Sequence, residues 1–303
     1  MTHLLLSLGR HFRGAVPLQS LPQLVGVTVD GIAFGLFLAL LGVGVTLVFG
    51  LGEVLNLAIG TFAIIGAVAA AVIAGGGTNP IIAAIVGIAL VGVLGLVVDR
   101  TVLSLVYRSD GEERILLGIF TTLGLTILLE GILFNLYPGR YRLALGLPTL
   151  SEGGVRLTSA SLLLIAVATI LLVGLFLFLD RMFLGRATRT IFQDETGALL
   201  VGVPPRQIRS LVFVLSSVVA AIAGVMYAIG TPVRVVDGLQ FTNFGLIVSI
   251  VGGIRSVRGA IVAGIILGLV VQYANFLLGS YQAQVILFLS AVAVIVYDPE
   301  VLS

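Results

Sequence analysis

The sequence has no cysteine and few charged residues, and both absences limit what the protein can be. Without cysteine the chain forms no disulfide bond, and its composition gives no indication of a redox compartment. Charged residues make up 10% of the chain and hydrophobic residues 59%, whereas soluble domains carry about 25% charged residues. The composition therefore favours a protein built mainly from membrane-spanning segments.

Lysine is also absent, and so are the motifs of common enzyme classes. All 16 basic residues are arginine, so the chain lacks the P-loop lysine that a Walker-type ATPase needs. The only histidines are His3 and His11, and no zinc-protease motif, Gly-x-Ser-x-Gly elbow or dinucleotide-binding turn is present. We therefore expect no catalytic residue, no metal ion and no cofactor. The net charge of +2 is spread over the loops and offers no face for nucleic acid.

Long uncharged stretches predict the fold, because a helix needs roughly 20 apolar residues to cross the hydrocarbon core. The sequence predicts spans near residues 26–49, 54–74, 80–99, 115–137, 159–179, 210–230, 259–279 and 282–297, with a shorter apolar run at 244–254. We expect an all-α polytopic membrane protein, a bundle of about 8 transmembrane helices with one or two broken or re-entrant segments. Residues 1–303 then form a single transmembrane domain, in which 1–21 is an N-terminal extension and 180–209 is a cytoplasmic loop.

Glycine and other small residues mark expected helix breaks and close helix contacts. Gly252, Gly253 and Gly259 predict a hinge between a short helix and a full span, because glycine adopts turns that other residues resist. The run Gly-Gly-Gly-Thr-Asn-Pro at 75–80 predicts another break. Small residues also repeat at four-residue spacing in two rows, Ala220-Gly224-Ala228 and Ala260-Gly264-Gly268. Such rows let helix backbones approach closely in a membrane, although general richness in glycine and alanine could also produce them.

The distribution of arginine predicts the orientation, because positively charged loops stay in the cytoplasm. The basic loop 180–209 is therefore placed inside. Alternation of spans then puts the loops at 99–114 and 255–258 inside and the loop at 138–158 outside. If all five predicted spans before the basic loop cross the membrane, the N-terminus lies outside. If the 50–74 segment instead returns to the side from which it entered, the N-terminus lies inside.

The basic loop contains a predicted helix at 194–201. Asp194 can accept the free N–H groups of the first turn, and Glu195 adds negative charge at the positive end of the helix dipole. Gly202 fits the left-handed position that ends many helices. Because so short a helix is marginal in water, we expect it to dock on a partner, with Ala198 on the docking surface. The alternative is a surface helix whose basic flanks bind anionic lipid.

Three polar residues in apolar segments are candidates for a solute pathway. Thr122, Thr126 and Glu130 share one helix face by their spacing, and Asn56 lies at the head of the 50–74 segment. An ionisable group inside a membrane normally faces a cavity or a partner. We therefore assign Asn56, Thr126 and Glu130 to the pathway. The alternative for Glu130 is a structural hydrogen bond near the outer surface of the membrane.

Four segments together carry a family resemblance. They are GVGVTLVFGLGEVLNLAIGTFAIIGA at 42–67, TTLGLTILLEG at 121–131, GRATRTIFQDETGALLVGV at 185–203 and SIVGGIRSVRGAIVAGIILG at 249–268. In order and spacing they resemble the branched-chain amino acid (hydrophobic amino acid uptake) permease family of ABC importers. The chain departs from that family at Ile59, Thr61 and Glu130, where the family commonly has histidine, glutamate and glutamine.

The resemblance implies a permease subunit of the cell membrane that carries branched-chain or other hydrophobic amino acids. It implies an identical or paralogous permease as dimer partner, ABC ATPase subunits, an extracytoplasmic solute-binding protein and surrounding membrane lipid. Asp194, Glu195, Ala198 and Gly202 would then belong to the helix that couples the permease to the ATPase. Related permeases carry urea or short amides, and a stand-alone secondary transporter or channel that uses Glu130 is a further alternative. The capped helix of the basic loop favours the ABC importer, because a stand-alone transporter leaves that helix unexplained.

Overall fold

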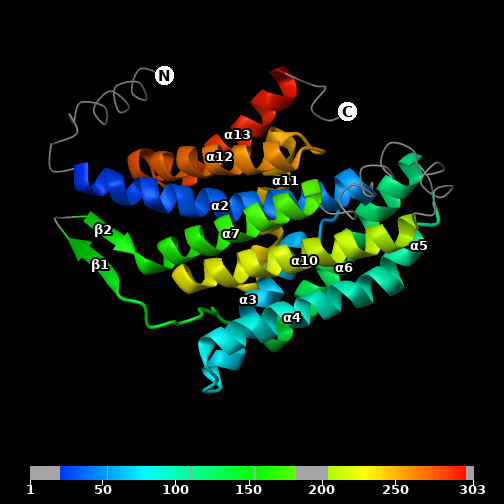
Figure 1. Ribbon diagram of the computed structural model, residues 1–303, viewed down its shortest axis with the longest axis horizontal. Helices are drawn as coiled ribbons and strands as arrows, with labels where there is room; N and C mark the ends of the chain where they lie inside the picture. Colours follow the sequence, from blue (N-terminus) through cyan, green and yellow to red (C-terminus); the bar gives the residue numbers. More distant parts are fainter. Residues whose placement is uncertain (1–20, 53, 110, 153–154, 182–203, 298–303) are drawn as a thin grey trace.

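The computed structural model describes residues 21–52, 54–109, 111–152, 155–181 and 204–297. In these residues the chain folds into a bundle of long helices that lie alongside one another (Figure 1). Seven helical segments of the described part are long and apolar enough to cross a membrane, and two shorter apolar helices accompany them. This confirms the expected polytopic helical membrane protein.

The long helices follow the predicted spans, and the short helix α5 and a β-hairpin lie outside them. In chain order they are α2 (Leu21–Gly52), α3 (Ile59–Gly75), α4 (Pro80–Val98), α5 (Ser104–Val106), α6 (Gly111–Leu136), α7 (Ser159–Arg181), α10 (Pro205–Gly230), α11 (Gly238–Gly252), α12 (Val257–Leu278) and α13 (Ser280–Tyr297). A π-helical turn, η2 (Asp99–Leu103), extends α4, and a 3-10 turn, η3 (Val235–Asp237), precedes α11. The strands β1 (Thr149–Glu152) and β2 (Val155–Thr158) pair antiparallel as a hairpin, which the sequence did not predict.

The predicted break at 75–80 separates α3 from α4. Gly77 has a φ of +89°, a conformation that glycine adopts easily. Pro80 occupies the first turn of α4, and the Asn79 side-chain oxygen accepts the Ile81 N–H at 2.9 Å. This N-cap satisfies a backbone donor that the helix cannot satisfy itself. The glycines, the cap and the proline together fix the end of one helix and the start of the next.

The two ends of the bundle differ in composition. One end, which we call the hairpin end, carries β1 and β2 before α7 (Figure 1). The opposite end, the arginine end, carries the starts of α6, α10 and α12. Its basic residues include Arg108, Arg114, Arg206, Arg209 and Arg258. Because positively charged segments stay inside, we expect the arginine end to face the cytoplasm and the hairpin end to face the outside.

α2 runs from the hairpin end to the arginine end. In its first half, the Asp30 carboxylate accepts a hydrogen bond from the Ser161 hydroxyl at the start of α7, at 2.6 Å. Near its last turn, a Cβ built on Gly50 would lie 3.6 Å from the Arg255 Cα. The start of α2 therefore lies at the hairpin end, which is the expected outer side. This agrees with the alternative in which the 50–74 segment crosses rather than returns.

Both rows of small residues lie at close helix contacts. A Cβ built on Gly268 of α12 would lie 2.1 Å from the Gly35 Cα of α2. A Cβ built on Gly224 of α10 would lie 2.0 Å from the Ala63 carbonyl oxygen of α3. Only glycine permits helix backbones to come so near one another. The rows are therefore packing interfaces and not a by-product of composition.

α3 is the buried centre of the bundle and packs against α4, α10 and α11. Its residues from Ile59 to Val68 are all buried. The predicted span at 54–74 was wrong at its N-terminal side, because the helix begins at Ile59 and residues 54–58 are not helical. Side chains from distant helices form hydrogen bonds with the backbone of residues 54–58, and these bonds make the non-helical stretch possible.

The first turns of α10 are fastened to the end of α4. Asp99 is buried in η2, and its carboxylate accepts a hydrogen bond from the Ser210 hydroxyl. The guanidinium of the preceding residue, Arg209, lies over the Tyr107 ring, 5.7 Å from the ring centroid. Such contacts between a buried charge and its partners resist separation, since a lone buried charge is costly. The start of α10 and the end of α4 are therefore held together.

Candidate functional site

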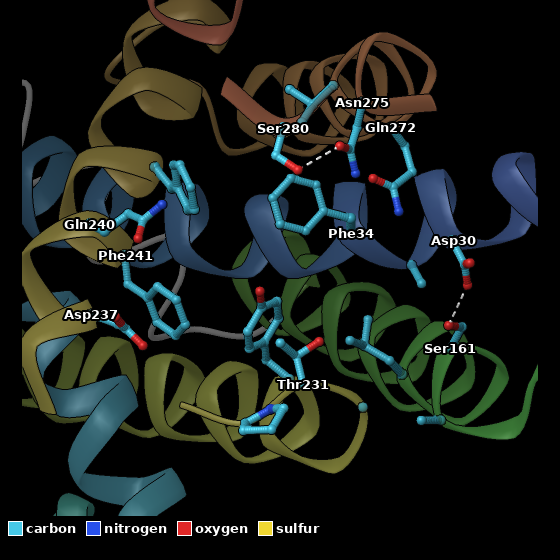
Figure 2. Close-up of a pocket in the computed structure, with 18 of the residues that line it drawn as sticks. Asp30, Phe34, Ser161, Thr231, Asp237, Gln240, Phe241, Gln272, Asn275 and Ser280 are labelled. Carbon is cyan, nitrogen blue, oxygen red and sulfur yellow. Dashed lines mark hydrogen bonds between the residues drawn. The ribbon is translucent and has the colours of Figure 1, made fainter. Parts of the chain in front are cut away.

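A cavity of about 740 Å³ lies at the hairpin end of the bundle. Side chains of α2, α7, α10, α11, α12 and α13 surround it, together with residues between α10 and α11 (Figure 2). α2 and α7 lie far in the sequence from the consecutive helices α10 to α13, and they meet them only in the folded chain. A concave site of this size that combines polar and apolar groups is the usual form of a small-molecule site.

The wall of the cavity is polar. Asp30 and Ser161 are joined by the hydrogen bond described above, and the Ser280 hydroxyl donates to the Asn275 side-chain oxygen at 2.8 Å. Gln272 of α12 lies between these pairs in Figure 2. Amide side chains both donate and accept hydrogen bonds. The wall can therefore bind a solute group of either polarity.

An ion pair lies at the edge of the cavity, just before α11. The Arg234 guanidinium donates to the Asp237 carboxylate at 2.8 Å, and the Arg234 backbone N–H donates to the same carboxylate at 2.8 Å. This carboxylate raises the pKa of the Arg234 side chain, which stays protonated. The pair is solvent-exposed and adds little stability. Its role in the fold is to hold the turn from which α11 starts.

The floor of the cavity is aromatic. Phe34, Tyr227, Phe241 and Phe244 line the cavity, and Phe37 lies behind them, stacked on Tyr227 with 4.5 Å between the ring centroids. We call these five rings the aromatic floor. They come from α2, α10 and α11 and contact one another edge-on or stacked, as aromatic pairs prefer. The floor offers an apolar surface opposite the polar wall.

Three threonine side chains form hydrogen bonds with the backbone of the non-helical residues 54–58. We call these three threonines the threonine junction. Thr122 of α6 accepts the Leu57 N–H at 3.0 Å, and the Thr126 hydroxyl lies 3.1 Å from the Leu57 carbonyl oxygen. Thr242 of α11 accepts the Gly60 N–H and donates to the Leu57 carbonyl oxygen, both at 3.0 Å. Non-helical backbone within a membrane needs such protein partners. The junction therefore ties α6 and α11 to the start of α3.

Two of the predicted pathway residues, Asn56 and Glu130, lie beside this junction. Asn56 is completely buried, and its side-chain oxygen accepts the Ala58 N–H at 3.0 Å. Its amide nitrogen has no hydrogen-bond partner among the described residues. The Glu130 carboxylate accepts the Thr61 hydroxyl at 3.4 Å and the backbone of Leu239, in the first turn of α11.

The structure thus brings Asn56, Thr126 and Glu130 together, but none of the three is among the residues that line the cavity. They hold the broken segment and the start of α11, whose next turns carry Phe241 and Phe244 of the aromatic floor. Their assignment to the pathway stays a prediction.

The helix break expected at Gly252, Gly253 and Gly259 is confirmed. α11 ends at Gly252, α12 begins at Val257, and Gly253 has a φ of +88°. A Cβ built on Gly259 would lie 1.7 Å from the Gly252 carbonyl oxygen, so the two segments touch through their backbones. Movement about this break stays a prediction.

The predicted docking helix, with Asp194, Glu195, Ala198 and Gly202, lies outside the described residues. Its role in coupling therefore rests on the sequence alone. In the described part of the chain, no group of three or more His, Asp or Glu side chains comes together as a metal site. The arrangement described above is suited to binding and passage of a solute.

Sequence reasoning missed the cavity itself. The pathway residues predicted from the sequence do not include Asp30 or the amide side chains of α11 and α12 that line the cavity. A usable signal was present, because Asp30, Ser161, Gln240 and Gln272 all interrupt apolar segments near the same end of the bundle. Polar residues at matching depth in several spans indicate a shared cavity.

Comparison with known proteins identifies the family. The family model described as the permease component of branched-chain amino acid transport systems matches residues 27–297. The high-affinity branched-chain amino acid transport system permease protein BraD of Pseudomonas aeruginosa is 25% identical over 296 residues, covering 89% of this chain and 92% of that protein. LivH of Escherichia coli K12, of the same description, is 25% identical over 295 residues, with the same coverage.

Among solved structures, PsaBC from Streptococcus pneumoniae in complex with Fab is similar at 16% identity and a TM-score of 0.46, covering 90% of each chain. The family model matches almost all of the described helices, from the first half of α2 to the end of α13. The chain therefore belongs to the family of permease components of branched-chain amino acid transport systems.

Proposed function

We propose that the chain carries branched-chain or other hydrophobic amino acids across the membrane as the permease subunit of an ABC importer, and that the cavity receives the solute from outside. The observation that carries this proposal is the cavity at the end of the bundle opposite the arginine end. An amino acid of this class has a charged head and an apolar side chain. The polar wall can bind the head, and the aromatic floor can accept the side chain.

Separate partners would supply energy and substrate. The chain has no P-loop lysine, so ATP hydrolysis would come from ABC ATPase subunits docked on the basic loop, with Asp194, Glu195, Ala198 and Gly202 in the contact helix. An extracytoplasmic solute-binding protein would deliver the amino acid to the hairpin end. A second permease, identical or paralogous, would complete the pathway.

The proposal is tested by transport in proteoliposomes. The permease is reconstituted with its cognate ATPase, second permease and solute-binding protein, and uptake of radiolabelled leucine is measured. We expect uptake that requires both ATP and the binding protein and that excess valine abolishes. If urea or a short amide competes instead, the amino acid assignment is wrong. Uptake driven by a proton or sodium gradient without ATP would favour the stand-alone transporter.

Replacement of Glu130 tests the role of the pathway residues. We expect Glu130→Gln to retain uptake within about twofold, because the amide oxygen can still accept the Thr61 hydroxyl and the Leu239 N–H. Glu130→Leu leaves both donors unsatisfied, at a cost of about 1–3 kcal/mol, and we expect uptake to fall roughly tenfold, since 1.36 kcal/mol corresponds to that factor. Initial rates of ATP-driven leucine uptake, at equal amounts of inserted protein, measure the difference.

The glutamine variant is the matched control for the loss of the carboxylate charge. If Glu130→Gln were as inactive as Glu130→Leu, the charge itself would be needed. Glu130 would then act as a proton or cation site, as in the alternative of a stand-alone transporter.

A further inference from the structure

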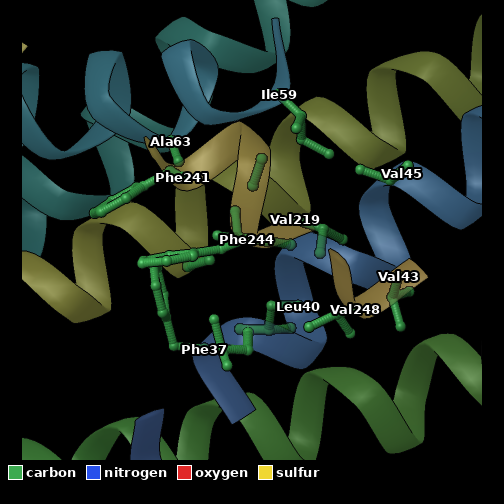
Figure 3. Close-up of a cluster of buried hydrophobic side chains, with 14 of the residues drawn as sticks. Phe37, Leu40, Val43, Val45, Ile59, Ala63, Val219, Phe241, Phe244 and Val248 are labelled. Atoms are coloured by element: carbon green, nitrogen blue, oxygen red, sulfur yellow. The ribbon is translucent and has the colours of Figure 1, made fainter. Parts of the chain in front are cut away.

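The inner side of the cavity is closed by the hydrophobic core. Phe241 and Phe244 of the aromatic floor line the cavity and also belong to the buried core cluster. Leu40, Val219 and Val248 lie in the same cluster and are fully buried (Figure 3). The cavity is therefore a recess in which a solute group can bind, and onward passage is left to the contact with the second permease.

Asp30 is the only charged residue of α2, and it lies in the wall of this recess. One of its carboxylate oxygens accepts the Ser161 hydroxyl at 2.6 Å. In the described part of the chain, the other oxygen forms no hydrogen bond and no arginine pairs with the carboxylate. An ionisable group in a membrane-spanning segment normally faces a cavity or a partner. The carboxylate is therefore available to a cationic group that enters the cavity.

Two side chains complete a site around Asp30. Phe34 lies one helical turn further along the same face of α2 and also lines the cavity. Gln272 of α12 lies close to this turn (Figure 2), since a Cβ built on Gly31 would lie 3.4 Å from the Gln272 Cβ. A carboxylate, an amide oxygen and an aromatic ring all bind ammonium groups, through an ion pair, a hydrogen bond and a cation–π contact respectively.

The other charged side chains that line the cavity do not neutralise Asp30. Arg234 and Asp237 are paired with each other at the edge, at 2.8 Å. Arg140 lines the cavity as an exposed side chain. Asp30 and Arg140 thus leave one charge of each sign on the lining. An amino acid also carries one charge of each sign at neutral pH, and Asp30 is suited to the positive one.

We propose that Asp30, Phe34 and Gln272 form an ammonium subsite, which binds the α-ammonium group of the amino acid in the cavity. Asp30 supplies the negative charge, the Gln272 side-chain oxygen accepts a hydrogen bond, and the Phe34 ring covers the cation. This inference deepens the proposed function and rests on it for the identity of the bound amine. The affinity of the subsite for an ammonium group is a property of the permease alone and can be measured without transport.

A cysteine beside Asp30 tests the charge of the subsite. The chain has no cysteine, so Gln272→Cys gives the purified permease a single thiol, whose reaction rates with a cationic and an anionic methanethiosulfonate are compared. We expect the preference for the cation to be about tenfold larger than in Gln272→Cys/Asp30→Asn, because a charged cleft concentrates ions of opposite sign. Equal preferences in the two proteins would overturn the proposal. An unreactive thiol would also overturn it, since position 272 would then not face the cavity.

Binding of an amine separates the subsite from a structural role of Asp30. Isopentylamine and its neutral isostere isopentanol are titrated against the permease in dodecyl maltoside by ligand-observed NMR. We expect the amine to bind at least about tenfold more tightly than the alcohol, which corresponds to 1.4 kcal/mol, and Asp30→Asn to remove the difference. The asparagine side-chain oxygen can still accept the Ser161 hydroxyl, so the fold should be unchanged.

The matched control is Ser161→Ala, which removes the hydrogen bond and keeps the carboxylate, and it should retain the preference for the amine. Loss of the preference in Ser161→Ala as well would show that Asp30 acts only as an acceptor for Ser161. In the reconstituted transporter, Asp30→Asn should raise the leucine concentration needed for half-maximal uptake, and an unchanged concentration would overturn the subsite. Amine binding by a wild-type permease that shows no leucine uptake would count against the transport function and leave the subsite in place.

Discussion

ATP-driven uptake will fall to background when Ala198 is replaced by arginine, although the chain will still insert into the membrane. Ala198 lies in the middle of the predicted helix at 194–201, where a small side chain lets the helix lie close to its partner. A long charged side chain at that position holds the two surfaces apart. Coupling requires contacts that differ between the states of the ATPase, so their loss disconnects hydrolysis from transport. Uptake and ATPase activity of the reconstituted transporter measure both halves of this expectation.

The control for this variant is Ala198→Ser, which keeps the small size and should retain uptake. The start of α10 follows the basic loop and is joined to α4 through Ser210 and Asp99. We therefore expect Ala198→Arg to leave the fold and thermal stability unchanged, because these contacts are untouched. Normal uptake by the arginine variant would show that residues 194–201 do not dock on the ATPase.

Helix breaks and close contacts could be read from the sequence because they depend on local chemistry. The run at 75–80 ends α3 through a left-handed Gly77 and starts α4 through Asn79 and Pro80, all within a few residues. The break at Gly253 has the same local origin. The row containing Gly224 was informative because small residues have one main use at a helix surface in lipid.

The start of α3 could not be predicted in this way, because long-range contacts determine it. Residues 54–58 are apolar enough to continue a helix, and they do not, since Thr122, Thr126 and Thr242 bond their backbone from α6 and α11. Nothing in the local sequence identifies partners so far along the chain.

The cavity was missed for the same reason. Asp30 and Ser161 are far apart in the sequence and become one hydrogen-bonded pair only after α2 and α7 pack together. A single span shows one polar residue near its end, which is equally typical of a membrane interface. Only the arrangement of six helices turns these residues into one wall.

Gly268→Leu will remove most of the folded permease from the membrane. A Cβ at this position would lie 2.1 Å from the Gly35 Cα and 2.8 Å from the Gly31 carbonyl oxygen. Both are backbone atoms of α2, the most buried of the spanning helices, so no side chain can move aside. The helices must separate along their length, and we expect a loss of about 3 kcal/mol or more, a large part of the stability of a typical domain. Yield in fluorescence-detected size-exclusion chromatography and the thermal midpoint in detergent measure this loss.

The matched control is Gly174→Leu in α7, where nothing lies within 4 Å of the added Cβ. Both variants replace a helical glycine by the same strong helix former, which gains roughly 0.5–1 kcal/mol in helix propensity. The control should therefore fold at least as well as the wild type, so that any deficit of Gly268→Leu reports the contact with α2. Equal yield and midpoint for the two variants would mean that α2 and α12 do not meet through glycine.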